Sequence, residues 1–206
     1  MNCQSKIELA LSHLSGIIGA SVSYETKLRE ELEKKEKRSE HFEHLAKPHP
    51  CMGGEAVGRA LELCPELRIV GIAGPGDTLA TDYALDTFEL VKRTYPELLS
   101  CLSTNGLQLP EKAERIAEIG LDTITVTVNA VDPEIQKEIC SYIIWNGKKI
   151  EGLKGAKILI ENQLKGIKAV ADAGVVVKIN SVLIPGINDH HIVEVARITS
   201  ELGFVS

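Results

Sequence analysis

The fold of this chain is decided by the stretch IVGIAGPGD at residues 69–77. It overlaps a short apolar run, Leu67 to Val70, which is typical of a buried strand. Three glycines, a proline and an aspartate follow within seven residues. A strand that ends in this way leaves backbone N–H and C=O groups bare at its carboxyl end, where α/β folds bind their ligands. We therefore interpret this turn as one rim of a ligand site.

The chain after Gly53 alternates between strand-like and helix-like patterns. Strands are expected at residues 67–72, 98–102, 123–128 and 175–183, and helices at residues 55–63, 86–94, 110–119, 155–173 and 192–202. Short loops between alternating elements indicate parallel β/α units and therefore an α/β fold. The carboxyl ends of the strands then share one rim, formed by residues 71–77, 103–105, 129 and 180–188.

The segment before these units has a different pattern. Residues 1–22 place apolar side chains at loosely helical spacing, and residues 26–47 alternate charges of both signs at i,i+4 spacing, as in a solvated helix. Pro48 and Pro50 end this pattern. We expect an N-terminal helical extension over residues 1–47 and a second domain over residues 48–206.

The composition narrows the classes of function. A formal charge of −6 and an aromatic content of 4% argue against a nucleic-acid partner. No apolar run reaches the roughly 18–20 residues of a membrane span, and the N-terminus lacks the basic region of a signal peptide. We therefore expect a cytoplasmic protein with no membrane partner. Five widely separated cysteines, an odd number, argue against a disulfide framework.

The turn at residues 71–77 has the pattern G-x-x-G-x-G-D, which is neither the dinucleotide fingerprint nor the P-loop. Glycines that permit positive φ in a tight turn are one explanation. Three glycines and a proline exceed the needs of one turn, so close approach of a ligand is favoured. Pro75 has no N–H to donate. The turn is therefore better suited to offer carbonyls to an ammonium group than to cradle a phosphate, which disfavours a phosphate-binding enzyme.

Polar residues also follow the other strands. The STNG segment at residues 103–106 is either a plain turn or a source of hydroxyl and amide groups for a ligand. Thr125, Thr127 and Asn129 alternate along one strand, so they share a face, as do Lys178 and Asn180. Polar groups on an interior face need partners, which are either cross-strand hydroxyls or a ligand.

Candidate metal ligands are few. The spacing is irregular among His41, His44, His49 and Cys51. The first two are better explained as solvated surface histidines than as metal ligands. Cys101, next to the predicted rim, is either a buried structural cysteine or a metal ligand. No Ser/His/Asp or Cys/His arrangement stands out, so no catalytic residue is assigned. From the residues alone, the chain is a β/α domain for a small polar ligand.

From about Leu61 to Gly203 the sequence resembles the radical S-adenosylmethionine (SAM) proteins of the NifB family, which build the precursor of the nitrogenase iron–molybdenum cofactor. The HPC tripeptide at residues 49–51, with GGEA at residues 53–56, also resembles the N-terminal signature of this family. Four longer segments carry the resemblance, at residues 70–77, 101–107, 125–134 and 178–189.

The resemblance implies an incomplete (β/α) barrel of parallel strands and the chemistry of a radical SAM enzyme. Family members bind a [4Fe–4S] cluster through CxxxCxxC, and its open iron chelates SAM. Electron transfer then cleaves SAM to a 5′-deoxyadenosyl radical. The family joins two further [4Fe–4S] clusters and inserts a carbon from a SAM methyl group. The implied partners are iron–sulfur cluster donors and cofactor-carrier proteins of nitrogenase assembly.

The resemblance also implies roles for residues at the rim. Gly74, Gly76 and Asp77 would face the methionine end of SAM. Ser103 and Asn105 would lie near its carboxylate and ribose.

The remainder of the implied SAM pocket comes from the later strands. Thr127, Asn129 and Ile179 would line it. Cys51 and Cys101 resemble ligands of a substrate cluster.

The chain departs from the family pattern in two ways. The family carries CxxxCxxC in a segment that would fall between Ala56 and Val57, and the five cysteines of this chain form no such motif. The family also continues beyond the position of Ser206. Because a cubane cluster is held by cysteine thiolates, we expect weak or no radical activity. The alternative to an impaired enzyme is a non-catalytic remnant that binds SAM or a partner protein.

Overall fold

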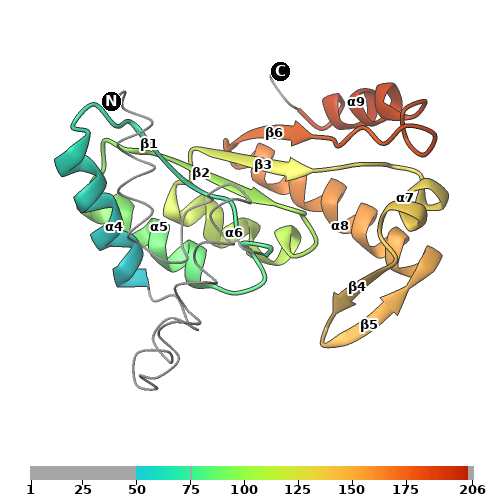
Figure 1. Cartoon of the computed structure of the whole chain (residues 1–206), viewed down its shortest axis with the longest axis horizontal. Coiled ribbons are helices and arrows are strands. Elements are labelled where there is room, and N and C mark those ends of the chain that lie inside the picture. Colours follow the sequence, from blue (N-terminus) through green and yellow to red (C-terminus); the bar gives the residue numbers. More distant parts are fainter. Residues whose placement is uncertain (1–49, 75, 204–206) are drawn as a thin grey trace, which may run out of the picture. The chain divides into compact units, whose positions relative to one another are not determined.

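A computed structural model describes residues 50–74 and 76–203, which include no helix long and apolar enough to cross a membrane. The predicted extension over residues 1–47 lies outside this described part. The chain divides into two compact units, one ending at Ser100 and the other beginning at Cys101. Four parallel strands form a sheet with the order β1-β2-β3-β6, and helices alternate with them (Figure 1). This confirms the predicted α/β class.

The first unit contains helix α4 (Pro50–Leu63), strand β1 (Ile69–Ile72) and helix α5 (Tyr83–Thr94). Small residues let α4 approach α5 closely, because a Cβ added at Gly53 or Gly54 would collide with Thr87 or Leu90. Helix α4 begins at Pro50, earlier than the start expected at residue 55. Ala56 and Val57, where the family pattern would place a further segment, are neighbours inside α4, and both are buried.

The second unit contains most of the remaining elements, and β2 crosses the boundary between the units. They are β2 (Leu99–Thr104), α6 (Leu109–Ile119), β3 (Thr123–Thr127), α7 (Pro133–Ile139), β4 (Tyr142–Trp145), β5 (Lys148–Glu151), α8 (Gly152–Asp172), β6 (Val176–Asn180) and α9 (Ile192–Ser200). The strands and long helices lie close to their expected positions.

Strand β3 lies between β2 and β6 and pairs with both in parallel. One side of these strands is buried, with Leu102, Ile124 and Val126 all 0% exposed, and helices α6 and α8 lie on one side of the strands (Figure 1). The opposite side, here called the open face, is less covered. Its residues in the second unit are Cys101, Ser103, Thr123, Thr125, Thr127, Val176, Lys178 and Asn180.

Local signals fix two helix ends as expected. The Asp132 carboxylate accepts a hydrogen bond from the Glu134 backbone N–H (2.8 Å), so Asp132 is the N-cap before Pro133. Helix α6 ends at Gly120, whose φ of 71° is the left-handed conformation that glycine adopts most readily.

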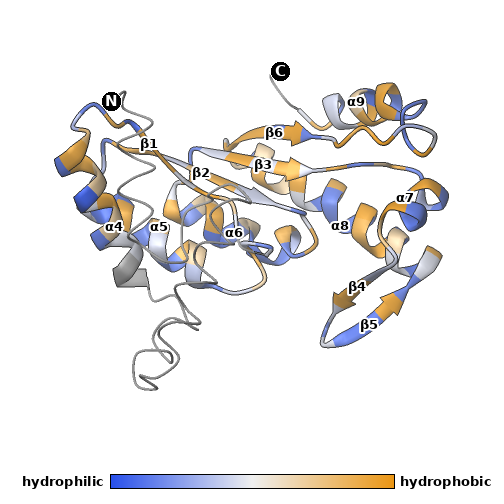
Figure 2. Ribbon diagram, in the orientation of Figure 1, coloured by the Kyte–Doolittle hydropathy of each residue, from blue (hydrophilic) through white to orange (hydrophobic). Residues whose placement is uncertain are grey.

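The hairpin of β4 and β5 is absent from the sequence-based assignment. Asn146 and Gly147 form its turn with φ of 50° and 71°, the backbone that a tight hairpin needs. Ile143 is buried with Leu107 and Leu159, and Trp145 and Ile150 pack against them. The turn is hydrophilic, whereas β4 is largely hydrophobic (Figure 2). The hairpin is thus attached to the unit by a small core of its own.

Three other details differ from expectation. Strand β2 extends to Thr104, so Ser103 and Thr104 lie within the strand and only Asn105 and Gly106 turn. Strand β6 ends at Asn180, earlier than expected, because the following backbone bonds to side chains instead of continuing the strand ladder. The buried Cys64 is disulfide-bonded, whereas Cys101 and Cys140 are free thiols.

Candidate functional site

The glycine-rich turn follows β1 in the first unit. Gly74 and Gly76 have φ of 139° and 76°, so the backbone itself requires glycine at both positions. A Cβ added at Gly76 would meet no atom within 4 Å, which leaves open space beside the turn. The Asp77 side chain accepts a hydrogen bond from the Leu79 N–H (3.0 Å) and shapes the return of the chain.

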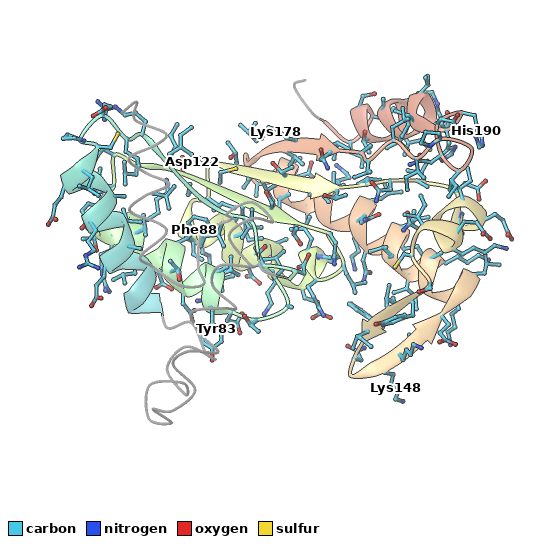
Figure 3. All side chains as sticks on the ribbon, viewed as in Figure 1. Tyr83, Phe88, Asp122, Lys148, Lys178 and His190 are labelled. Atoms are coloured by element: carbon cyan, nitrogen blue, oxygen red, sulfur yellow. The ribbon has the colours of Figure 1, made fainter. Side chains whose placement is uncertain are left out.

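Polar side chains cross the open face of the second unit in two rows. The first row consists of Ser103 on β2, Thr125 on β3 and Lys178 on β6, which are in register. The second row lies nearer the carboxyl ends of the strands and pairs Thr127 with Asn180. The strand ends in this unit therefore meet as the sequence predicts. Lys178, which projects from β6 (Figure 3), is the one charged side chain among the described residues of this face. The rows offer hydroxyl groups, an amide and an ammonium group to a ligand.

Two predicted site residues also hold the loops that follow the strands. Asn105 is exposed, and its Oδ1 accepts a hydrogen bond from the Leu107 N–H (2.8 Å). Asn129 is half-buried, and its Oδ1 accepts one from the Val182 N–H (2.9 Å). Each side chain therefore shapes a loop beside the open face. Ligand contacts by either residue stay a prediction.

Ile179 lies on the other side of the sheet from the threonines. It is in register with the buried Val126, whereas Thr127 and Lys178 project from the open face. Successive side chains of a strand point to opposite faces. Only the backbone of Ile179 is therefore available to a ligand on the open face.

Two buried amides that join the strand ends were not predicted from the sequence. Gln163 on α8 donates from Nε2 to the carbonyls of Asn105 (2.7 Å) and Thr127 (2.9 Å). Asn188 donates from Nδ2 to the carbonyls of Asn129 and Val182, both at 2.9 Å. A polar residue among apolar ones on α8 was the available signal for Gln163. Asn188 lay within a segment that the resemblance had already singled out.

The residues that the structure describes do not fit a [4Fe–4S] cluster. Among the side chains that the structure describes, no group of three or more His, Cys, Asp or Glu is placed to hold a metal. Cys101 is a half-buried free thiol on the open face. The side chain of Cys51 and the predicted histidines at 41, 44 and 49 lie outside the described part.

The fold and the open face define a class, a β/α domain that presents polar groups at the carboxyl ends of parallel strands. The sequence model of the radical SAM superfamily matches residues 54–198, and the chain belongs to this superfamily. That match covers most of α4, most of α9 and all the helices and strands between them.

Individual relatives narrow the similarity further. The chain is 45% identical over 141 residues to the FeMo cofactor biosynthesis protein NifB of Methanocaldococcus jannaschii, covering 68% of this chain and 47% of the relative. It is 47% identical over 139 residues to the NifB protein of Frankia alni, covering 67% of this chain and 27% of that one. The NifB protein of Chlorobaculum tepidum is 42% identical over 148 residues, 71% of this chain and 35% of its own length. The chain thus spans half or less of these relatives.

Proposed function

We propose that this chain is a NifB-type protein of FeMo-cofactor biosynthesis that binds SAM on the open face of its sheet. The observation that carries the proposal is the pair of polar rows, Ser103–Thr125–Lys178 and Thr127–Asn180, on a chain of the radical SAM superfamily. The similarity to NifB proteins supports the role in cofactor assembly.

SAM has an amino group, a carboxylate, a ribose and an adenine, and the chain offers complementary groups. The Lys178 ammonium suits an anionic carboxylate, with hydroxyls of Ser103 and Thr125 in register. In this proposal the binding surface also includes Asn105, Thr127, Asn129 and the backbone of Ile179.

The same proposal limits what this chain does by itself. CxxxCxxC does not occur in the sequence, and the described residues do not fit a cluster. We therefore infer no radical cleavage of SAM by these residues, and binding is the activity that their side chains support. The cluster donors and carrier proteins of nitrogenase assembly are the corresponding partners.

Titration of the full, cluster-free chain with SAM by isothermal calorimetry tests the binding proposal. We expect saturable binding of one SAM per chain, weakened at least about tenfold by Lys178→Ala because an ion pair to the carboxylate is lost. Lys165→Ala is the matched control, because Lys165 is an exposed lysine on helix α8. Wild-type chain without saturable heat would overturn the proposal.

Anaerobic treatment of the chain with iron and sulfide tests the inference that its residues do not cleave SAM. We expect no stoichiometric cluster absorbance and no 5′-deoxyadenosine above a protein-free blank. Formation of 5′-deoxyadenosine by the purified chain would replace the binding role with that of an active radical SAM enzyme.

A further inference from the structure

Gln163 is a polar residue on the buried side of helix α8. It is 2% exposed, and the same side of the helix carries the buried Ile160 and Ile167. Transfer of an amide into such surroundings is unfavourable unless its hydrogen bonds are replaced. Both N–H bonds of its amide are used, because Nε2 donates to the carbonyls of Asn105 and Thr127.

These two carbonyls belong to the carboxyl ends of neighbouring strands. Thr127 is the last residue of β3, and Asn105 follows the last residue of β2. The strand ladder stops there, so one side-chain amide continues the cross-strand connection beyond the sheet. The next carbonyl in the loop, that of Leu107, accepts from Asn162 Nδ2 (3.0 Å). Neighbouring side chains of α8 therefore fix the loop after β2 at two points.

The loop is also held sterically against Gln163. Gly106 has φ of 82°, and a Cβ there would approach Gln163 Cγ and Val126 Cγ1 to 2.9 Å each. Its N–H donates to Thr104 Oγ1 (3.1 Å). The contact leaves little freedom for the amide of Gln163 to move relative to the strand ends.

The Gln163 amide is not fully satisfied; in this it resembles the buried Gln136 and differs from the buried Asn188. Gln163 Oε1 is buried and has no hydrogen-bond partner among the described residues. Asn188 is 0% exposed, and its Oδ1 accepts from the Ile184 N–H (2.7 Å). A buried acceptor without a partner is a stability cost. A glutamine that carries this cost is best explained by what its Nε2 group does at the strand ends, since violations of local rules concentrate at functional sites.

We propose that Gln163 is a positioning residue of the SAM-binding surface. By joining the ends of β2 and β3 it sets the separation of Asn105 and Thr127, and so the placement of the Ser103 and Thr127 side chains on the open face. Gln163 itself stays on the opposite side of the sheet and does not touch the ligand. This inference rests on the proposed binding of SAM.

Gln163→Met tests the inference, because methionine keeps the length of the side chain and removes both donors. Val170→Ala is the matched control. Val170 is 0% exposed on the same helix, but its carbonyl bonds to Val175 at the amino end of β6, away from the strand ends. Both substitutions lower stability, and only the first removes the clamp.

We expect Gln163→Met to weaken SAM binding about tenfold, the effect of losing two ordinary hydrogen bonds, and Val170→Ala to leave the affinity within about twofold. Equal weakening by both variants would reduce Gln163 to a structural residue and overturn the inference, as would unchanged affinity in Gln163→Met.

A second measurement does not depend on SAM. Amide hydrogen exchange at residues 105–107 and 127–129 should be at least about tenfold faster in Gln163→Met than in Val170→Ala. If the wild-type chain binds no SAM, the proposed function fails while this measurement still decides whether Gln163 positions the strand ends. If Gln163→Met does not fold, the wild-type side-chain amide protons of Gln163 decide the question. Slow exchange supports the clamp, and exchange at the rate of an exposed glutamine overturns it.

Discussion

Single residues at the strand ends show what sequence patterns can and cannot reveal. Thr127 and Asn129 were identified because alternation along one strand is a local pattern. Gln163 and Asn188 were not, because the strand-end carbonyls to which they donate, those of Asn105, Thr127 and Asn129, lie 36 to 59 positions away in the chain. A local pattern contains no information about which distant carbonyls need a donor, so buried amides become visible only in the folded chain.

Asn188 gives the first prediction at the scale of the residue. Asn188→Ala removes two donors and one acceptor from a fully buried position, leaving the carbonyls of Asn129 and Val182 unpaired. We expect the free energy of unfolding to fall by about 3 kcal/mol, measured by urea denaturation. His190→Ala, at an exposed neighbour, should change it by less than about 0.5 kcal/mol. Similar small losses in both variants would contradict a structural role for Asn188.

Glu194 gives a prediction about pH. Hydrogen bonds from the Arg197 guanidinium hold the pKa of the Glu194 carboxyl below its ordinary value. Because the pKa is lowered in the folded chain, the stabilising contribution is present above the pKa of the unfolded chain. It is lost as the pH falls through the lowered value. In Arg197→Gln we expect the Glu194 pKa to rise toward its ordinary value in an NMR titration. An unchanged titration curve would count against the ion pair.

Helices and strands could be predicted from the sequence where a strong local pattern occurs at a position that the folded chain also stabilises. The β-branched run at β3 and the Asp132–Pro133 helix start are examples. The hairpin was missed although Asn146-Gly147 is a strong turn signal. Its strands have four residues each, and their stability comes from contacts with Leu107 and Leu159. Short strands that depend on distant apolar partners have little pattern of their own.

The pairing of α6 with α8 depends on one small residue. A Cβ at Gly166 would approach Leu109 Cβ and Cγ to 2.7 Å. Alanine favours a helix over glycine by up to about 1 kcal/mol, but overpacking costs roughly 1–3 kcal/mol, so we expect Gly166→Ala to destabilise the chain. Thermal unfolding measures this, with Lys165→Ala on the exposed side as the control. A higher melting temperature in Gly166→Ala would show that the helices can separate without cost.

At the scale of the molecule, alternation of elements was enough to predict the fold class, because parallel β/α units leave few other arrangements. From the residues alone the site was predicted as a set of strand ends, and the individual site residues were implied by the family resemblance. Alternation along β6 alone places Ile179 on the side opposite to Lys178, and the register with β3 places it opposite to Thr127. Because the sequence contains no local signal for register, the relation of Ile179 to Thr127 became visible only in the folded chain.

The overall charge gives a prediction for the whole chain. With a formal charge of −6, the chain should repel polyanions, because nucleic-acid binding depends on neutralising phosphates with basic groups. We expect no shift of duplex DNA or RNA in a gel assay at low salt. Salt-sensitive, stoichiometric retention of either would refute this expectation and require a basic surface.

The position of β6 in the chain has a consequence for synthesis on the ribosome. Strand β3 pairs with β6 only after α7, the hairpin and the long helix α8 have been translated. During that interval the growing chain presents an unpaired β3 edge, which is a template for pairing with other chains. Translation speed and chaperone access over residues 128–180 should therefore influence how much of this protein reaches its folded state.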